Sequence, residues 1–264
     1  MIPKVRRAKT RKMVTLEVLA NTAPSPAFRT VTLGGPDLDA FEPAGDDQAV
    51  RLFFPRAGQD GLRMPTLDHE GWMAEVLMMP KSRRPWVRNY TIRRSRPGEI
   101  DIEFALHDGD APAADWARRA RPGDPAGVFD LGVSYLPPSG VSWQLLAADE
   151  SALPAALAIL ENAAADLVAE VFLEVPSKSD VREVEAPSGV NVHWLPRDSG
   201  RLPGTLALET IRSAPLPDGP SYTWVAGEAK LATGVRRHLV RDRGRPRSDI
   251  AFLGYWRHGR ASPG

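Results

Sequence analysis

The stretch Arg88-Asn89-Tyr90-Thr91-Ile92-Arg93 alternates polar residues with aromatic and β-branched ones, which predicts a β-strand. Alternation places Arg88, Tyr90 and Ile92 on one face of this strand and the other three residues on the opposite face. One face then presents a guanidinium beside a phenol ring, a pair that can hold a phosphate and stack on an aromatic ring of the same ligand. The hydroxyl and backbone amide of Thr91 add hydrogen-bonding groups for the edge of such a ring. An ordinary half-buried strand with a surface arginine has the same pattern, so this stretch alone leaves both interpretations open.

The composition limits the classes of function. The chain has 264 residues, enough for one large domain or two smaller ones, and a net charge of +1, which gives no strong attraction to nucleic acid or to membranes. Cysteine is absent, which excludes disulfides, Cys-ligated metal sites and thiol chemistry. Any redox function must therefore depend on a bound organic cofactor.

The sequence contains no apolar run near the roughly 18 residues that a membrane span requires. Its basic N-terminus, residues 1–12, is not followed by the apolar segment of a secretion signal, so we expect a soluble cytoplasmic protein. That basic segment is either an arm that binds nucleic acid or a solvated, frayed terminus. The near-neutral charge and the lack of interleaved aromatic residues favour the frayed terminus.

The first half of the chain contains short strand patterns separated by turn signals. This spacing predicts a small antiparallel β-barrel, with one short helix before its last strand. The expected strands are residues 13–21, 28–33, 49–54, 88–93, 99–106 and 125–135, the helix is 112–120, and 59–70 is a polar loop.

The pattern of predicted elements changes near residue 140, at a Pro-Pro-Ser-Gly segment. Strand and helix patterns alternate beyond it, which predicts a parallel sheet flanked by helices. The expected strands are 143–148, 169–175, 191–195, 222–226 and 249–255, and the expected helices are 152–166, 205–213 and 230–242. We therefore expect two domains, residues 1–140 and 141–264.

Common nucleotide-binding and hydrolytic motifs are absent from the sequence, and its five histidines are too scattered to predict a metal site. A first candidate segment runs from His107 through a Gly109 turn to Pro112, where a helix is expected to begin. The N-terminus of a helix suits a diphosphate, although a plain strand-to-helix turn has the same pattern.

Two further segments follow buried strands of the second half. Asp149 comes after an apolar strand, where it or Ser151 is expected to cap a helix, although a carboxylate there also suits acid–base catalysis. Gly227 permits a sharp exit from another strand, at the end where such sheets bind ligands. Near the C-terminus, Trp256 belongs to an aromatic pair before Arg257 that either covers a flat ring or packs an edge strand.

Four ordered motifs resemble those of the siderophore-interacting protein family. They are Arg-x-Tyr-Thr at residues 88–91, the segment from His107 to Trp116, the string Leu145 to Ala155, and the pair Trp-x-Ala-Gly-Glu at 224–228 with Gly-Tyr-Trp-Arg-x-Gly at 254–259. These motifs lie in this order between residues 88 and 259.

The resemblance implies a ferredoxin-reductase-like architecture. An N-terminal antiparallel β-barrel would bind FAD, and a C-terminal parallel-sheet α/β half would resemble a nicotinamide-binding domain. The implied activity is reduction of ferric siderophores to release iron(II), with electrons from NADPH, NADH or a ferredoxin. Neither nucleic acid nor a membrane span is expected.

The resemblance also assigns roles to individual residues. In the first half, Arg88 would hold the FAD phosphate, Tyr90 would stack on the isoalloxazine and Thr91 would bond its edge. The cofactor contacts implied for the rest of the chain comprise Asn89, His107, Pro112, Ala113, Ala114, Asp149, Gly227 and Trp256, and Arg257 would meet an anionic ferric siderophore.

One position departs from the family pattern. The family usually has an arginine where this chain has Gly132, and Asp130 stands where the family has glycine. A pocket with an extra carboxylate and without that arginine attracts an anion less, although Lys81, Arg83 and Arg84 offer other positive charges. The sequence therefore leaves two alternatives to a siderophore reductase: a flavin enzyme with another small-molecule acceptor, and a non-catalytic nucleotide-binding protein.

Overall fold

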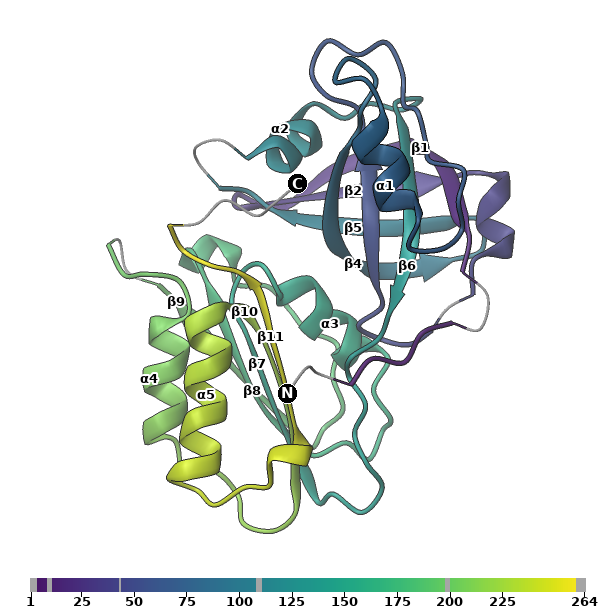
Figure 1. Ribbon diagram of the computed structural model, residues 1–264. Helices are drawn as coiled ribbons and strands as arrows, with labels where there is room; N and C mark the ends of the chain where they lie inside the picture. The colour runs from purple at the N-terminus through teal and green to yellow at the C-terminus, as the bar shows by residue number, and fades with distance from the viewer. Residues whose placement is uncertain (1–3, 9–10, 43, 108–110, 198–199, 260–264) are drawn as a thin grey trace. The chain divides into compact units, whose positions relative to one another are not determined.

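A computed structural model describes residues 4–8, 11–42, 44–107, 111–197 and 200–259 of the chain (Figure 1). The chain divides into two compact units. We call Arg6–Val133 the barrel unit, and Ser134 onward, together with Lys4 and Val5, the α/β unit.

Six antiparallel strands close the barrel in the order β1-β2-β5-β4-β3-β6, which confirms the predicted barrel. The strands are β1 (Met13–Ser25), β2 (Phe28–Gly34), β3 (Ala49–Phe54), β4 (Trp86–Arg96), β5 (Glu99–Ala105) and β6 (Pro125–Gly132). Alternate residues of these strands, among them Val50, Leu52 and Ile102, fill the interior, as the period of two in their sequences requires.

Two helices cover parts of the barrel. Helix α2 (Pro112–Arg119) buries Trp116 and Ala117 against the barrel core, as predicted. Helix α1 (Trp72–Met78) was not predicted: it packs Trp72 and Val76 against the outward-facing Phe53 and Phe129. A short 3-10 helix, η1 (Pro36–Ala40), follows β2.

The α/β unit is a five-stranded parallel sheet in the order β11-β10-β7-β8-β9. Its strands are β7 (Trp143–Ala148), β8 (Ala169–Val175), β9 (Val190–Pro196), β10 (Ser221–Glu228) and β11 (Ile250–Trp256). Helices α4 (Thr205–Ser213) and α5 (Ala229–Arg241) cover one face and α3 (Leu153–Glu161) the other (Figure 1). Short 3-10 helices, η2 (Lys178–Asp180) and η3 (Arg247–Asp249), follow β8 and α5.

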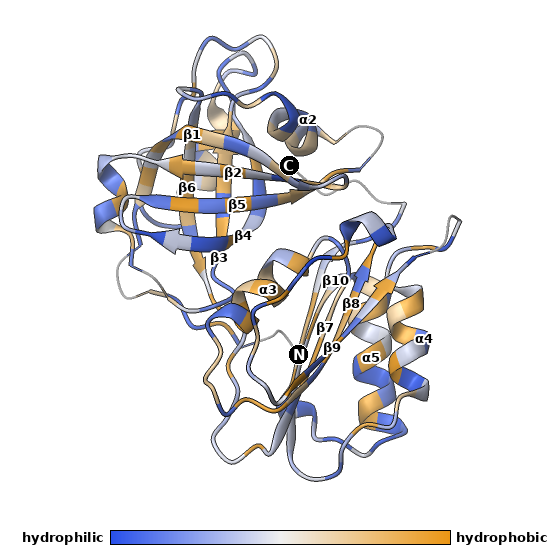
Figure 2. Cartoon of the chain, turned by 180° about the vertical axis from the view of Figure 1, so that it is seen from behind, coloured by the Kyte–Doolittle hydropathy of each residue, from blue (hydrophilic) through white to orange (hydrophobic). Residues whose placement is uncertain are grey.

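Helix α3 is shorter than its sequence pattern suggests, because it ends at Glu161 and the prediction ran to residue 166. The side chain of Asn162 donates to the carbonyl of Ala158 at 2.9 Å and so satisfies a carbonyl of the last turn. The two helices on the opposite face carry mixed hydrophobic and hydrophilic residues (Figure 2). Their apolar residues, such as Ile211 and Val235, are buried against the sheet.

The strand order creates a switch point between β7 and β10. The chain continues from β7 to β8 and β9 on one side, and then returns to add β10 and β11 on the other. Parallel strands end at one common edge, and ligands of such sheets bind outside that edge near the switch point. Among the described residues, no helix combines the length and apolarity needed to cross a membrane.

Candidate functional site

In the barrel unit, Tyr90 lies at the surface of the core, half-buried, and it is not sealed inside. Its ring packs against Phe104 with the ring centroids 4.4 Å apart and an interplanar angle of 48°. Burial raises the pKa of the Tyr90 phenol, and the positive charge of Arg88 opposes this shift. The phenol therefore stays neutral at physiological pH. Because the side chain is only half-buried, part of its surface is open to a ligand.

Residues of β4 alternate between the two faces, as predicted. Trp86, Tyr90 and Ile92 belong to the interior cluster, whereas Val87 packs with helix α1 outside the barrel. Asn89 shares this outer parity and is exposed, and its side-chain oxygen accepts a hydrogen bond from Arg51. Alternation therefore separates the Asn89 side chain from those of Arg88 and Tyr90.

Thr91 shares the outward parity of Asn89 and is buried. It pairs with Ala49 of β3, one step along the ladder from the pair formed by Tyr90 and Val50. Its backbone is thus next to the phenol, while its hydroxyl is on the other face. The roles of Asn89 and Thr91 toward a cofactor stay predictions.

Positive charge gathers around the start of β4. The guanidinium carbons of Arg56 and Arg88 lie 3.8 Å and 5.0 Å from the centroid of the Trp86 ring. Burial lowers the pKa of Arg56, and the charges of Arg84 and Arg88 lower it further. Among the described residues neither Arg56 nor Arg88 has a carboxylate partner, so the cluster suits an added anion. Sequence reasoning identified Arg88 but missed Arg56, which β-pairing alone brings close.

A cavity of 240 Å³ adjoins this cluster in the barrel unit. It lies between the loop after β3, the second half of α2 and the start of β6, and its walls mix charged, polar and aromatic groups. The lining includes Arg56, Gln59, Asp60, Trp116, Arg119 and Asp124. The positive charges of Arg56 and Arg119 and the negative charges of Asp60 and Asp124 therefore meet at this cavity.

Helix α2 is tied to the same region. The ring centroids of Trp116 and Phe104 are 5.8 Å apart, and Phe104 also packs against Tyr90. Helix α2 and strand β4 therefore both contact the Phe104 ring. Pro112 begins the helix, and no side chain of a described residue caps it. Ala113 and Ala114 are buried in its first turn.

The preceding turn is only partly described. The carbonyl of His107 accepts a hydrogen bond from Arg118 at 3.2 Å. The predicted turn at Gly109 lies outside the described residues.

The N-terminal segment is attached to the barrel at Arg6, contrary to the sequence-based expectation. The predicted frayed terminus is wrong at Arg6, which forms a β-bridge with Val133 and donates from its side chain to the carbonyl of Ala44. The arm covers Gly132, whose φ is +87°, and a Cβ there would lie 2.2 Å from the carbonyl oxygen of Arg6. Any side chain at residue 132, including the family's arginine, would collide with this backbone.

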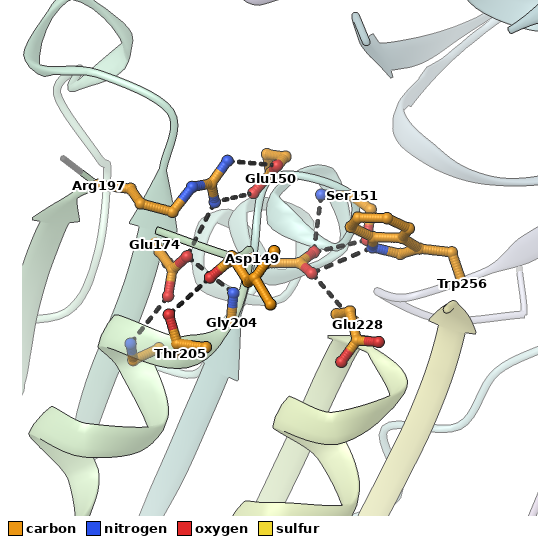
Figure 3. A network of polar contacts seen from close by, with 11 residues as sticks. Asp149, Glu150, Ser151, Glu174, Arg197, Gly204, Thr205, Glu228 and Trp256 are labelled. Carbon is orange, nitrogen blue, oxygen red and sulfur yellow. Dashed lines mark hydrogen bonds and ion pairs between the residues drawn. The ribbon is translucent and has the colours of Figure 1, made fainter. Parts of the chain in front are cut away.

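In the α/β unit, Asp149 lies directly after β7 with no exposed surface. One carboxylate oxygen accepts from the amide and hydroxyl of Ser151 at 2.9 and 2.6 Å. The other accepts from the amide of Glu228 at 2.6 Å and from the indole of Trp256 at 3.2 Å (Figure 3). Asp149 thus joins the ends of β7, β10 and β11 at the switch point.

The predicted capping role of Asp149 or Ser151 is wrong, because α3 begins with Ala152 at its cap position and has no side-chain cap. Burial, and after it the nearby charge of Glu150, raise the pKa of the Asp149 carboxyl to about 7, while the bonds from Ser151 and Glu228 oppose the shift. A carboxyl in this range titrates near physiological pH.

A second buried network continues along the same edge. Arg197, after β9, donates to both oxygens of Glu150 at 2.8 and 2.9 Å and to Glu174 at 2.8 Å. Glu174 also accepts from the backbone amides of Gly204 and Ala207, at 2.8 and 2.9 Å, at the start of α4 (Figure 3). Sequence analysis missed Glu150, Glu174 and Arg197 as a group, although each comes at or next to the end of a strand.

The structure brings Asp149, Gly227 and Trp256 together, and their roles toward a cofactor stay predictions. The ring of Trp256 is half-buried and lies edge-on to His258 with the ring centroids 6.2 Å apart. The side chain of Arg257 is exposed. Among the described residues, no group of three His, Cys, Asp or Glu side chains has metal-binding geometry.

Comparison with known families matches both halves. Residues 17–134 match the siderophore-interacting FAD-binding domain, and residues 141–259 match the siderophore-interacting protein model.

Two characterised relatives match nearly full length. The chain is 31% identical to ferric vibriobactin reductase ViuB of Vibrio cholerae, over 87% of this chain and 84% of that protein. It is 29% identical to the NADPH-dependent ferric-chelate reductase of Escherichia coli, over 91% of each chain.

Solved structures agree with this similarity. A siderophore utilization protein from T. fusca superposes with a TM-score of 0.84 and 31% identity, covering 99% of this chain and 98% of that one. The ferredoxin reductase of carbazole 1,9a-dioxygenase has a TM-score of 0.63 at 15% identity, covering 93% of this chain and 68% of that one, which shows a shared fold. The predicted ferredoxin-reductase-like architecture is therefore confirmed.

Proposed function

Because the chain belongs to the siderophore-interacting protein family, we propose that it is an FAD-dependent oxidoreductase that reduces ferric siderophores and so releases iron(II). The observation that carries the proposal is the cluster of Arg56 and Arg88, without carboxylate partners, near the half-exposed Tyr90 ring and inside the segment that matches the FAD-binding domain. Residues 1–140 would form the FAD domain and 141–264 the donor-side domain.

The barrel unit offers the groups that FAD requires. Arg88 and Arg56 would hold the two phosphates, because their guanidinium groups are close and lack carboxylate partners. At the start of α2, after Pro112, the backbone amides of Ala113 and Ala114 would donate to the same diphosphate. Tyr90 would offer a flat, neutral face to the isoalloxazine, and Phe104 behind it would keep that face in place.

Bound FAD supplies the chemistry that links a two-electron donor to a one-electron acceptor. The chain's own task is then to position the cofactor and to recognise the acceptor. The exposed Arg257 would attract the anionic shell of a ferric siderophore, with the iron as substrate. Gly132 has no side chain and offers no charge. The backbone of Arg6 leaves no space for a charged side chain at this position.

The electron donor would be NADPH or NADH. The name of the Escherichia coli relative favours NADPH, and a ferredoxin stays an alternative donor. A cytoplasmic location would give access to all three. Asp149, Gly227 and Trp256 would line the donor side, since they meet at the switch point of the sheet.

The test begins with the absorption spectrum of the purified protein. A flavin spectrum, or uptake of added FAD, is expected, and a protein that binds no FAD would exclude both flavin-enzyme hypotheses. Reduced protein is then mixed anaerobically with ferric siderophores and an iron(II) chelator. Formation of the iron(II)–chelator complex supports siderophore reduction, whereas a reducible flavin without iron(II) release would favour another small-molecule acceptor.

A further inference from the structure

The carboxyl edge of the parallel sheet is occupied by the chain's own acidic side chains. In parallel sheets this edge exposes the N-termini of the following helices, which often bind a diphosphate through free amides and the helix dipole. Here Asp149, Glu174 and Glu228 follow or end β7, β8 and β10, and all three are at least 99% buried.

The starts of α4 and α5 already have a carboxylate, whereas at α3 the carboxylate of Asp149 bonds only to Ser151, the residue before the cap. Glu174 accepts the amides of Gly204 and Ala207 in the first turn of α4. Glu228 caps α5 by accepting the amide of Lys230, and its other oxygen accepts the amide of His258 at 3.2 Å. Asp149 accepts the amide of Ser151 just before α3 (Figure 3).

The first residues of α3 have no free amide hydrogen to offer an anion. The amides of Ala152 and Leu153 donate to the backbone carbonyl of Asp149 at 3.0 and 2.9 Å, and Pro154 has no amide hydrogen. A phosphate would therefore have to displace a buried carboxylate at α4 and α5, and the backbone carbonyl of Asp149 at α3.

The local charge also opposes a phosphate. Asp149, Glu150, Glu174 and Glu228 are all at least 98% buried, and Arg197 pairs with two of them, Glu150 and Glu174. One arginine leaves the cluster negative when the carboxylates are ionised. An added diphosphate would meet like charges in a site from which water is largely excluded, where repulsion is strong.

We infer that this edge is closed to the diphosphate of a nicotinamide donor, so that a donor contacts it only through its uncharged parts. The inference rests on the proposed donor, and it makes Glu174 a specificity-determining residue. Any affinity for the phosphates must come from outside the starts of α3, α4 and α5.

Hydrogen exchange of the full-length, FAD-loaded protein tests the inference with inorganic pyrophosphate and ADP-ribose as separate probes. The expected result is unchanged exchange in residues 149–155, 203–208 and 228–232 at millimolar probe. Increased protection of any of these segments in the unaltered protein would overturn the inference.

The variant Glu174→Ala frees the amides of Gly204 and Ala207 and should bind pyrophosphate about tenfold more tightly, with new protection at 203–208. Glu170→Ala is the matched control, since Glu170 lies on the same strand but bonds to Asn191 and His193. A folded Glu174→Ala protein with no gain would contradict the inference. If that variant does not fold, Glu174→Gln, which removes only the charge, must show a smaller gain.

The FAD spectrum of each sample separates the two proposals. Failure to bind FAD would overturn the proposed function while leaving the exchange result on the helix starts intact. Bound FAD together with protection of the helix starts would overturn only the inference.

Discussion

The carboxylate of Asp149 occupies the space that a side chain at Gly227 would need: a Cβ built on Gly227 would lie 2.5 Å from Asp149 Cγ. The two residues are 78 positions apart in the chain, yet each explains the other. Asp149 reaches the amide of Glu228 only because residue 227 has no side chain. Gly227 also has a φ of +133°, which disfavours other residues.

Gly227→Ala should therefore destabilise the protein by about 2–4 kcal/mol, from steric overlap and backbone strain. The free energy of unfolding in urea measures this cost. Gly61→Ala is the control, because a Cβ at Gly61 meets no atom within 4 Å and should change stability by less than about 0.5 kcal/mol. Equal effects of the two substitutions would show that Asp149 is not held against residue 227.

The Asp149 carboxyl predicts a pH dependence of stability. Its pKa in the folded protein is about 7, raised by burial and then by Glu150, whereas an unfolded aspartate titrates near about 4. The folded state therefore binds more protons between these values, and this group's contribution to stability falls as pH rises from about 4 to about 7.

Urea unfolding at several pH values measures how steeply the free energy of unfolding falls with pH. Asp149→Asn should flatten it, whereas Asp166→Asn, at an exposed position, should leave it unchanged. An identical slope in Asp149→Asn would assign the pH dependence to other groups.

Tyr90→Ala should weaken FAD binding by about tenfold or more, because the ring face supported by Phe104 is lost. Tyr90→Phe keeps the ring and should retain most of the affinity. Titration of the apoprotein with FAD, followed by flavin fluorescence, measures both. Full affinity in Tyr90→Ala would place the isoalloxazine elsewhere.

Arg56→Ala should also weaken FAD binding, by about tenfold, and should reduce its dependence on salt, because one cation of the cluster is removed. Arg83→Ala, an exposed arginine in the segment before β4, serves as the control. If the two variants bind FAD equally well, the stack of Arg56 on Trp86 is structural only.

Arg197→Ala should destabilise the protein by about 3–5 kcal/mol, because it leaves the buried Glu150 and Glu174 without their cation. Arg201→Ala removes an exposed ion pair with Glu209 and should cost less than about 1 kcal/mol. Thermal and urea unfolding compare the two. A small effect of Arg197→Ala would show that the buried glutamates do not depend on this cation.

Local patterns predicted most of the elements because each strand or helix has a periodicity that its own residues carry. Alternation from Arg88 to Arg93 correctly placed Tyr90 and Ile92 on one face of β4, which the structure turns toward the barrel interior. Helix α1 was missed because it is only seven residues long and follows a polar, glycine-containing loop. The end of α3 was placed too late because the capping contact of Asn162 is not visible in periodicity.

Contacts between segments that are distant in the sequence could not be predicted from local patterns. Nothing near Gly132 in the sequence indicates that Arg6 lies against it, and nothing near Glu174 indicates the amides of α4, 30 and 33 positions later. Barrel closure and the order of the parallel strands create these proximities. The same holds for Arg56 beside Arg88, which strand pairing of β3 and β4 brings together.

The residue order alone was enough to identify the family, the succession of strands and helices, and the chemistry available at Arg88, Tyr90 and Asp149, since these depend on residue type and short-range spacing. Chain topology was needed to learn which charges meet and which amides are already bonded. Burial and hydrogen bonding set the state of a carboxylate such as Asp149, and both arise from segments that are neighbours only after folding.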